Sequence, residues 1–196
     1  CCLSVKGSVI WVCLNTTGCG GWQVVVSGTS PVAEGGWNLK TNGVVPLALA
    51  DRALTSSSVK VNGNAQFDLV LNGPPSLQSI SGKVSANGAS VALPSQRLSV
   101  DDVTVIADIA NSMVNTRASA SLSTGGQVAG EGQISLNQKQ GFPADIKMRL
   151  TNVIQRDRNF YTTTLNGNIA LSGPLLFGPK FSGQIDLRDT EVNIQE

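Results

Sequence analysis

The sequence contains no histidine, and this absence excludes more chemistry than any other feature of its composition. Without an imidazole there is no serine–histidine or cysteine–histidine catalysis, no histidine metal ligand and no imidazole pH switch. Charged residues make up only 14% of the chain, whereas about 25% is usual for a globular domain. The net charge is +1 and no basic stripe lies beside aromatic residues, so we expect no nucleic-acid partner.

Long apolar runs are also missing. No stretch of about 18 apolar residues is present, so we expect no segment that spans a bilayer as a helix. The chain begins with Cys1 and Cys2, without an initiator Met or the basic segment of a signal peptide. We therefore interpret it as an internal part of a longer protein, whose membrane anchor would lie outside this sequence.

The four cysteines all lie in the first tenth of the chain. Their spacing lacks the close C-x₂-C pairs of zinc sites, so we expect no metal. Two interpretations stay open: small apolar thiols, or a disulfide between Cys13 and Cys19 across a turn in an oxidising compartment. Acidic residues such as Glu131 and Asp145 fall at outward strand positions, and nothing in the sequence points to a catalytic pair or a cofactor.

Alternation of apolar and polar residues runs through most of the chain and predicts an all-β fold of about a dozen strands with one apolar face. The clearest run is residues 145–151, where Ile146, Met148 and Leu150 alternate with charged residues. Another strand is expected from Leu3 to Leu14. The residues predicted to line the apolar face are Val61, Ala65, Phe67, Leu69, Leu71, Ile146, Met148, Leu150, Leu165, Ile169, Leu171, Phe181, Ile185 and Leu187.

Apolar residues of one strand face stand at either odd or even sequence positions, and we call this their parity. A change of parity distinguishes strands that continue from strands that reverse. A two-residue turn at Asn62-Gly63 would mix apolar and polar residues on one face, so we predict a continuing strand with a bend at Gly63. The same reasoning places Asn166-Gly167 inside a strand and the next reversal at residues 173–179. At Asn87-Gly88 a two-residue turn would place the apolar residues before and after it on one face, and we predict a β-hairpin there. A slip in parity at Asp101-Asp102 predicts a turn or a bulge.

One short helix is predicted at residues 46–54, PLALADRAL, because Pro46 suits the first helical position and three apolar residues share a helical face. An internal repeat lies further along the chain. VNGNAQFDLVLNGPP, residues 61–75, is echoed by LNGNIALSGPLL, residues 165–176, and each is followed by S-G-x-apolar. Such self-similarity predicts a sheet built from repeated strand units.

Several segments together resemble the TamB family of AsmA-like, bridge-like proteins, the inner-membrane-anchored subunits of the translocation and assembly module of Gram-negative bacteria. The segments are VVPLALADRAL, SLQSISGKVSANGASV, SLSTGGQVAGEGQISL, GFPADIKMRL and LSGPLLFGPKFSGQIDLRDTEVNIQE. The resemblance covers residues 36–196, which we expect to form one continuous groove segment. Residues 1–35 match poorly and are expected to form N-terminal β-strands.

The resemblance implies a long curved β-sheet, a taco-like or open β-helix-like groove with an apolar inner face. It implies a periplasmic position in a protein anchored to the inner membrane. It also implies a part in phospholipid transport to the outer membrane, in outer-membrane protein assembly and secretion, or in both, without enzymatic activity. The predicted face residues would contact phospholipid acyl chains, and a TamA-like β-barrel partner would bind outside this chain.

Pattern alone leaves other architectures open. Two such faces could pack together, or the sheet could close into a β-helix with a filled core, as in a secreted adhesin or autotransporter passenger. A polysaccharide-acting β-helix enzyme is a third alternative, and it would need a cluster of carboxylates on one outer face.

Overall fold

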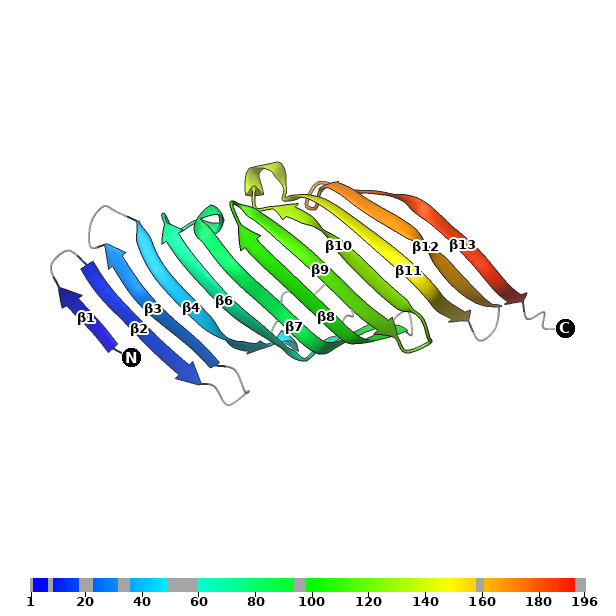
Figure 1. Ribbon diagram of the computed structural model, residues 1–196, viewed down its shortest axis with the longest axis horizontal. Coiled ribbons are helices and arrows are strands. Elements are labelled where there is room, and N and C mark those ends of the chain that lie inside the picture. The colour runs from blue at the N-terminus through cyan, green and yellow to red at the C-terminus, as the bar shows by residue number, and fades with distance from the viewer. Residues whose placement is uncertain are drawn as a thin grey trace.

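The computed structural model describes residues 2–6, 9–17, 23–31, 36–48, 60–93, 98–157 and 161–192. In these ranges, strands form one 13-stranded sheet in the order β1-β2-β3-β4-β6-β7-β8-β9-β10-β11-β12-β13, with β5 paired to β7. Each pairing is antiparallel, and all except β4–β6 and β5–β7 join strands that follow one another along the chain. β5 and β6 are separated only by Gly63, so the sheet as a whole is a meander (Figure 1). The all-β prediction is confirmed.

The elements have the following bounds. The strands are β1 (Cys2–Lys6), β2 (Val9–Thr17), β3 (Gln23–Pro31), β4 (Trp37–Pro46), β5 (Lys60–Asn62), β6 (Asn64–Gly73), β7 (Ile80–Leu93), β8 (Leu98–Ala110), β9 (Met113–Leu122), β10 (Gln127–Ser135), β11 (Pro143–Asp157), β12 (Tyr161–Pro174) and β13 (Lys180–Val192). Two short 3-10 helices, η2 (Leu77–Ser79) and η4 (Gln138–Gln140), lie in connections at one edge of the sheet.

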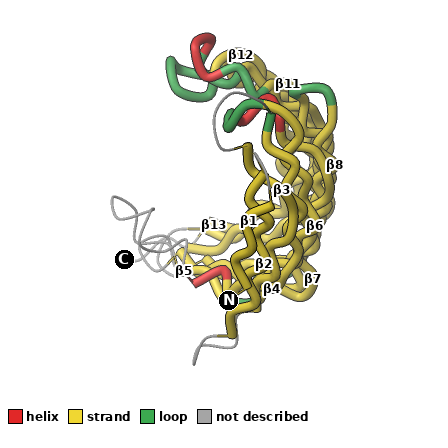
Figure 2. The backbone as a smooth tube through the Cα atoms, turned by 90° about the vertical axis from the view of Figure 1, so that its left-hand side faces the viewer, coloured by secondary structure: helices red, strands yellow, loops and turns green. Residues whose placement is uncertain are grey.

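The sheet is a single curved layer. Viewed along its length, the strands bend into an open trough (Figure 2). Among the described residues no large side chain is fully buried, and the buried apolar side chains are those of Ala65, Ala86, Ala89, Ala144 and Val153. A sheet that packed on a second layer would bury large side chains between the layers. The described part of the chain therefore has no conventional core.

Several strands have an irregularity at a similar level of the sheet, and we call these positions the crease. Gly63, between β5 and β6, has φ +115°, and a side chain there would come within 2.9 Å of the Ala89 Cα atom on β7. β7 has its own irregularity at Asn87-Gly88, β8 at Asp101-Asp102 and β11 at Thr151-Asn152. Bulges bend a strand and increase its twist, so these irregularities bend the strands that contain them; the pairings of β10 with β9 and β11 have no register shift.

Buried side chains of the apolar face lie beside the crease. Ala65, Ala86, Ala89 and Val153, four of the buried side chains, lie beside the crease at apolar-face positions. Side chains on the inside of a bend crowd together, whereas those on the outside spread apart and become more exposed. The burial of these four side chains shows that the apolar face is crowded at the crease.

Several sequence predictions about reversals are confirmed. β5 and β6 both pair with β7 on either side of Gly63, so the strand continues through a bend there. Asn166-Gly167 lies inside β12, and the chain reverses between Pro174 and Lys180. Asp101-Asp102 is a bulge in β8, with Asp102 at φ +51°.

The hairpin predicted at Asn87-Gly88 is wrong. β7 runs unbroken from Ile80 to Leu93, and Gly88, with φ +63°, lies in a bulge between Ala86 and Ala89. An extra residue in a bulge shifts the parity of the apolar residues in the same way as a two-residue turn, which explains the error. The apolar residues on either side share one face, as predicted, but within one strand.

The single strand predicted from Leu3 to Leu14 is also wrong, because β1 and β2 are separate antiparallel strands in which Val5 pairs with Ile10. Of the predicted helix at residues 46–54, Pro46 ends β4, residues 47–48 form a 3-10 turn, and residues 49–54 lie outside the described residues. Cys13 is opposite Cys2 in the register, while Cys19 lies outside the described residues. The Cys13–Cys19 disulfide and the division at residue 35 stay predictions.

Candidate functional site

The apolar face is continuous across the sheet because apolar residues on successive strands lie directly opposite one another. Directly opposed residues of antiparallel strands share a face, and we call each such set a cross-strand row. One row contains Phe67, Val84, Ala107, Thr116, Gly132, Ile146, Leu171 and Phe181. The next contains Ala65, Ala86, Val105, Ala118, Gly130, Met148, Ile169 and Gly183.

Bulges keep the rows on the same face beyond the crease. Leu150 pairs with Gly167, and Val153, three residues later on β11, pairs with Leu165. Three residues apart would normally mean opposite faces, but the bulge at Asn152 adds the residue that returns Val153 to the apolar face. The row then continues from Leu165 to Leu187 on β13.

The register places all 14 residues predicted to line the apolar face on that one face. On β5 and β6 these are Val61, Ala65, Phe67, Leu69 and Leu71, and on β11 to β13 they are Ile146, Met148, Leu150, Leu165, Ile169, Leu171, Phe181, Ile185 and Leu187. Sequence alone did not show which residues of distant strands are opposed, since that requires the register. Their contact with lipid stays a prediction.

The face extends across many strands. The rows traced above run through eight strands, β6 to β13, and their seven intervals of about 4.8 Å give a length on the order of 30 Å. At the β13 edge the apolar side chains are strongly exposed: Phe181 to 66%, Ile185 to 47% and Leu187 to 65%. An apolar surface of this length, open at its edge, is far larger than the scattered apolar residues of ordinary protein surfaces.

Glycines on the apolar face stand opposite bulky residues. Gly82 lies between Leu69 and Ile109, and Gly167 between Leu150 and Ile185. A side chain at Gly82 would collide with the Asp68 carbonyl oxygen of the neighbouring strand. Glycine in a strand allows close backbone approach and strong bending, so these positions allow the sheet to curve.

Charged residues on the opposite, polar face form alternating ladders across strands. Asp68, Lys83 and Asp108 are successive neighbours in one row, and the Lys83 Nζ atom lies 3.3 Å from Asp108 Oδ1. Arg117, Glu131 and Lys147 form a second ladder. Because these groups are exposed, each ion pair adds little stability, but opposite charges in register disfavour a slipped pairing.

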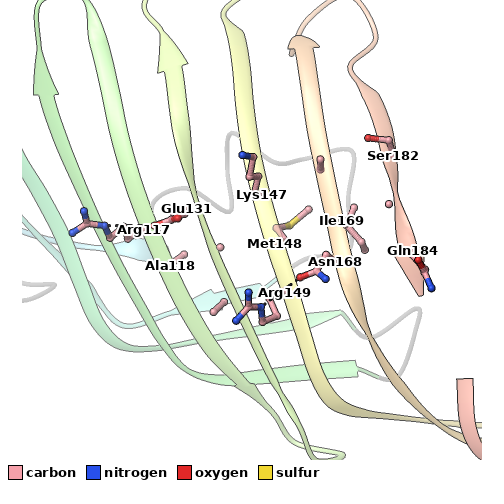
Figure 3. A pocket seen from close by; sticks show the side chains of 14 residues that line it. Arg117, Ala118, Glu131, Lys147, Met148, Arg149, Asn168, Ile169, Ser182 and Gln184 are labelled. Atoms are coloured by element: carbon pink, nitrogen blue, oxygen red, sulfur yellow. Dashed lines mark hydrogen bonds and ion pairs between the residues drawn. The ribbon is translucent and has the colours of Figure 1, made fainter. Parts of the chain in front are cut away.

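The polar face also carries a hollow of about 930 Å³ across β9 to β13. Its lining includes the polar-face residues directly before and after Met148 and Ile169. Ile146 and Leu150, the next apolar-face residues of β11, are not part of the lining, so the hollow lies on the polar face. In Figure 3, Lys147 and Arg149 extend to one side of β11 and Met148 to the other. The charged lining is Arg117, Glu131, Lys147 and Arg149, which leaves an excess of positive charge.

This hollow was missed by sequence reasoning, which identified the charged residues of 145–151 only as alternating with apolar ones. Glu131 and Asp145 are on the polar face, where Glu131 stands between Arg117 and Lys147. In the described residues, no group of three or more His, Cys, Asp or Glu side chains is arranged to hold a metal ion. A helix of the length and hydropathy needed to cross a bilayer is likewise absent from the described part of the chain.

Comparison with known proteins concerns mainly the C-terminal strands. Residues 115–196, from within β9 to the last residue, match the family model for the TamB C-terminal domain. Residues 36–114, which the sequence resemblance also included, lie outside this match. No match was found among curated proteins or among solved structures. Over residues 115–196, which form the curved antiparallel strands from within β9 onward, the chain is therefore similar to the TamB C-terminal domain.

Proposed function

We propose that the chain shelters the acyl chains of phospholipids against the apolar inner face of its sheet, as one segment of a TamB-type lipid path. The observation that carries this proposal is the unbroken apolar face, which runs from strand to strand without a covering layer in the described residues. The family match supports the broader role, a TamB-type function in lipid transport or secretion.

Energetics favour such a surface over free diffusion of lipid. Burial of each CH₂ is worth about 0.8 kcal/mol, so exposing one chain of roughly sixteen carbons to water costs on the order of 13 kcal/mol. A row such as Val105, Ala118, Met148 and Ile169 offers apolar contact at each step without a polar group that would fix the lipid in place. Movement along the rows needs contact but no chemical reaction, so we propose no enzymatic activity.

A β-helical adhesin with a filled core receives less support. Such a core would contain large, fully buried side chains, and the described residues contain none. The carboxylates Glu131 and Asp108, which an enzyme would need free and close together, each lie beside a cation of the charge ladders. The open apolar face distinguishes the transport proposal from both alternatives.

Location and partners follow from the family resemblance. We propose a periplasmic position in a protein held at the inner membrane by a segment outside this chain. A TamA-like outer-membrane β-barrel would bind other regions of that protein. The cargo could then be phospholipid or an unfolded outer-membrane protein, and both would use the same apolar face.

Photo-cross-linking in cells tests the proposal. A photoreactive residue at Phe67 or Ile169, on the apolar face, should capture phospholipid, whereas the same residue at Asp68 or Ala170, one position along each strand, should not. The adjacent positions are matched controls because they share the strand and differ only in face. Equal labelling of both faces, or no lipid adduct, would refute the proposal, and adducts to polypeptide alone would indicate protein cargo.

A further inference from the structure

The β12–β13 connection carries an exposed apolar tip. It lies on the side of the sheet formed by the strand ends at the β6–β7, β8–β9, β10–β11 and β12–β13 connections, and in this subsection we call that side the edge. Leu176 and Phe177, which we call the apolar tip, are 63% and 69% exposed. The connection itself, residues 173–179, contains no charged residue. Figure 1 shows this connection and the β10–β11 connection side by side at the upper edge of the sheet. Exposed apolar side chains that lie together at a turn are typical of a surface that contacts a protein or a membrane.

Hydrogen bonds hold the tip in this outward position. The Leu175 and Leu176 amides donate to the carbonyls of Phe142 and Gly141, at 3.3 and 3.2 Å. Gly141 has φ +71°, and a side chain there would come within 2.6 Å of the Phe177 ring. The tip is therefore fixed by its neighbour on the same edge. Because it is already held outward, little conformational entropy would be lost when it binds.

Charge on this edge favours an anionic lipid surface as the partner. The described connections here are residues 73–80, 110–113, 135–143 and 173–180, and their charged residues are Lys139 and Lys180, without a carboxylate. Both lysines are exposed. Apolar side chains flanked by cations match the interface of a bilayer, where the apolar groups enter the headgroup region and lysines approach lipid phosphates.

We propose that this edge docks on a bilayer containing anionic lipid, with Leu176 and Phe177 inserted and Lys139 and Lys180 against the headgroups. The proposal concerns the edge of the sheet and does not depend on lipid in the trough. In Figure 2 the β12 end forms one lip of the trough, so docking would bring that lip to the membrane surface.

Vesicle co-sedimentation of the full chain tests this docking. The chain should sediment with vesicles of phosphatidylcholine and phosphatidylglycerol and only weakly with phosphatidylcholine alone. The double variant Leu176→Ser, Phe177→Ser should lower the partition coefficient by about tenfold or more, since inserting even part of two such side chains is worth over 1.4 kcal/mol. Lys139→Gln with Lys180→Gln should reduce binding only to vesicles that contain phosphatidylglycerol.

Val192→Ser is the matched control, because Val192 is 66% exposed at the other end of β13. It should leave vesicle binding unchanged. Docking is refuted if the wild-type chain fails to sediment with anionic vesicles, or if the tip variant binds as well as wild type. A protein partner for the tip would appear as the first of these outcomes.

A second measurement, lipid cross-linking, distinguishes membrane docking of the tip from lipid binding by the apolar face. Lipid capture by a photoreactive residue at Ile169 depends on the apolar face and should persist in the tip variant with detergent-solubilised lipid. Loss of docking with capture intact supports two separate lipid contacts. Capture without any wild-type docking would refute the membrane proposal alone. Far-UV circular dichroism of each variant shows whether the sheet has formed.

Discussion

Two glycines on β7 allow the curvature of the sheet to be tested by single substitutions. Both have positive φ, +134° at Gly82 and +63° at Gly88, but their surroundings differ. A side chain at Gly82 would meet the Asp68 carbonyl oxygen and lie 2.9 Å from the Leu69 Cα atom, whereas at Gly88 it would meet nothing within 4 Å. Alanine at the two positions therefore separates backbone strain from collision with the neighbouring strand.

The expected costs follow from these contacts. Gly88→Ala introduces a left-handed residue, which costs about 1–2 kcal/mol, and the reduced entropy of the unfolded chain offsets about 0.4–1 kcal/mol of this. Gly82→Ala adds a φ that is nearly restricted to glycine, about 1–3 kcal/mol, and a displacement of the adjoining backbone, about 1–3 kcal/mol more. We expect a loss of about 2–6 kcal/mol at Gly82 before the same entropic offset, and of at most about 1.6 kcal/mol at Gly88.

Urea unfolding followed by circular dichroism measures both losses, with hydrogen exchange of β6 and β7 amides as a local readout. Gly88→Asn serves as a further control, since asparagine tolerates the left-handed region better than alanine and should cost less. Equal destabilisation by the two alanine substitutions would refute the reasoning, because it would mean that β6 does not approach Gly82 closely.

Two further substitutions test the polar face and the crease. Lys83→Glu places a carboxylate between Asp68 and Asp108 and should destabilise the sheet by roughly 1 kcal/mol, an effect that high salt removes; a salt-independent loss would contradict it. Asp102→Gly should be neutral or stabilising because Asp102 has φ +51°. Deletion of Asp102 should destabilise the sheet strongly, because it removes the bulge residue and moves the side chains on one side of it to the opposite face. Urea unfolding distinguishes these outcomes, and a tolerated deletion would show that the bulge is dispensable.

The fold class and the division between faces could be predicted from the sequence because both depend on local parity. Ile146, Met148 and Leu150 alternate with charged residues, and an alternation of this kind has only one burial solution in a strand. Asn166-Gly167 was correctly kept inside a strand for the same reason. Parity is a property of consecutive residues, so no tertiary information was needed.

Features that depend on pairing could not be predicted. Asn87-Gly88 fits a hairpin and a bulge equally well, and the choice is made by β8, which pairs with β7 on both sides of Gly88. The position of Glu131 between Arg117 and Lys147 likewise follows from the register of three strands. For the apolar tip, the sequence indicated a loop at residues 173–179, but not the hydrogen bonds that the Leu175 and Leu176 amides donate to the β10–β11 connection.

The changes of parity in this sequence occur at the bulges of the crease. A long strand that bends sharply needs an irregularity, and a bulge supplies it by adding one residue. That extra residue would turn every side chain beyond it to the opposite face unless the sequence shifts its apolar residues by one as well. The sequence makes this shift after Asn152, where Val153 joins the apolar face, and after Asp102, where Val103 does so. The bulges in β8 and β11 therefore share one role, which is to bend each strand while keeping its apolar residues on one face.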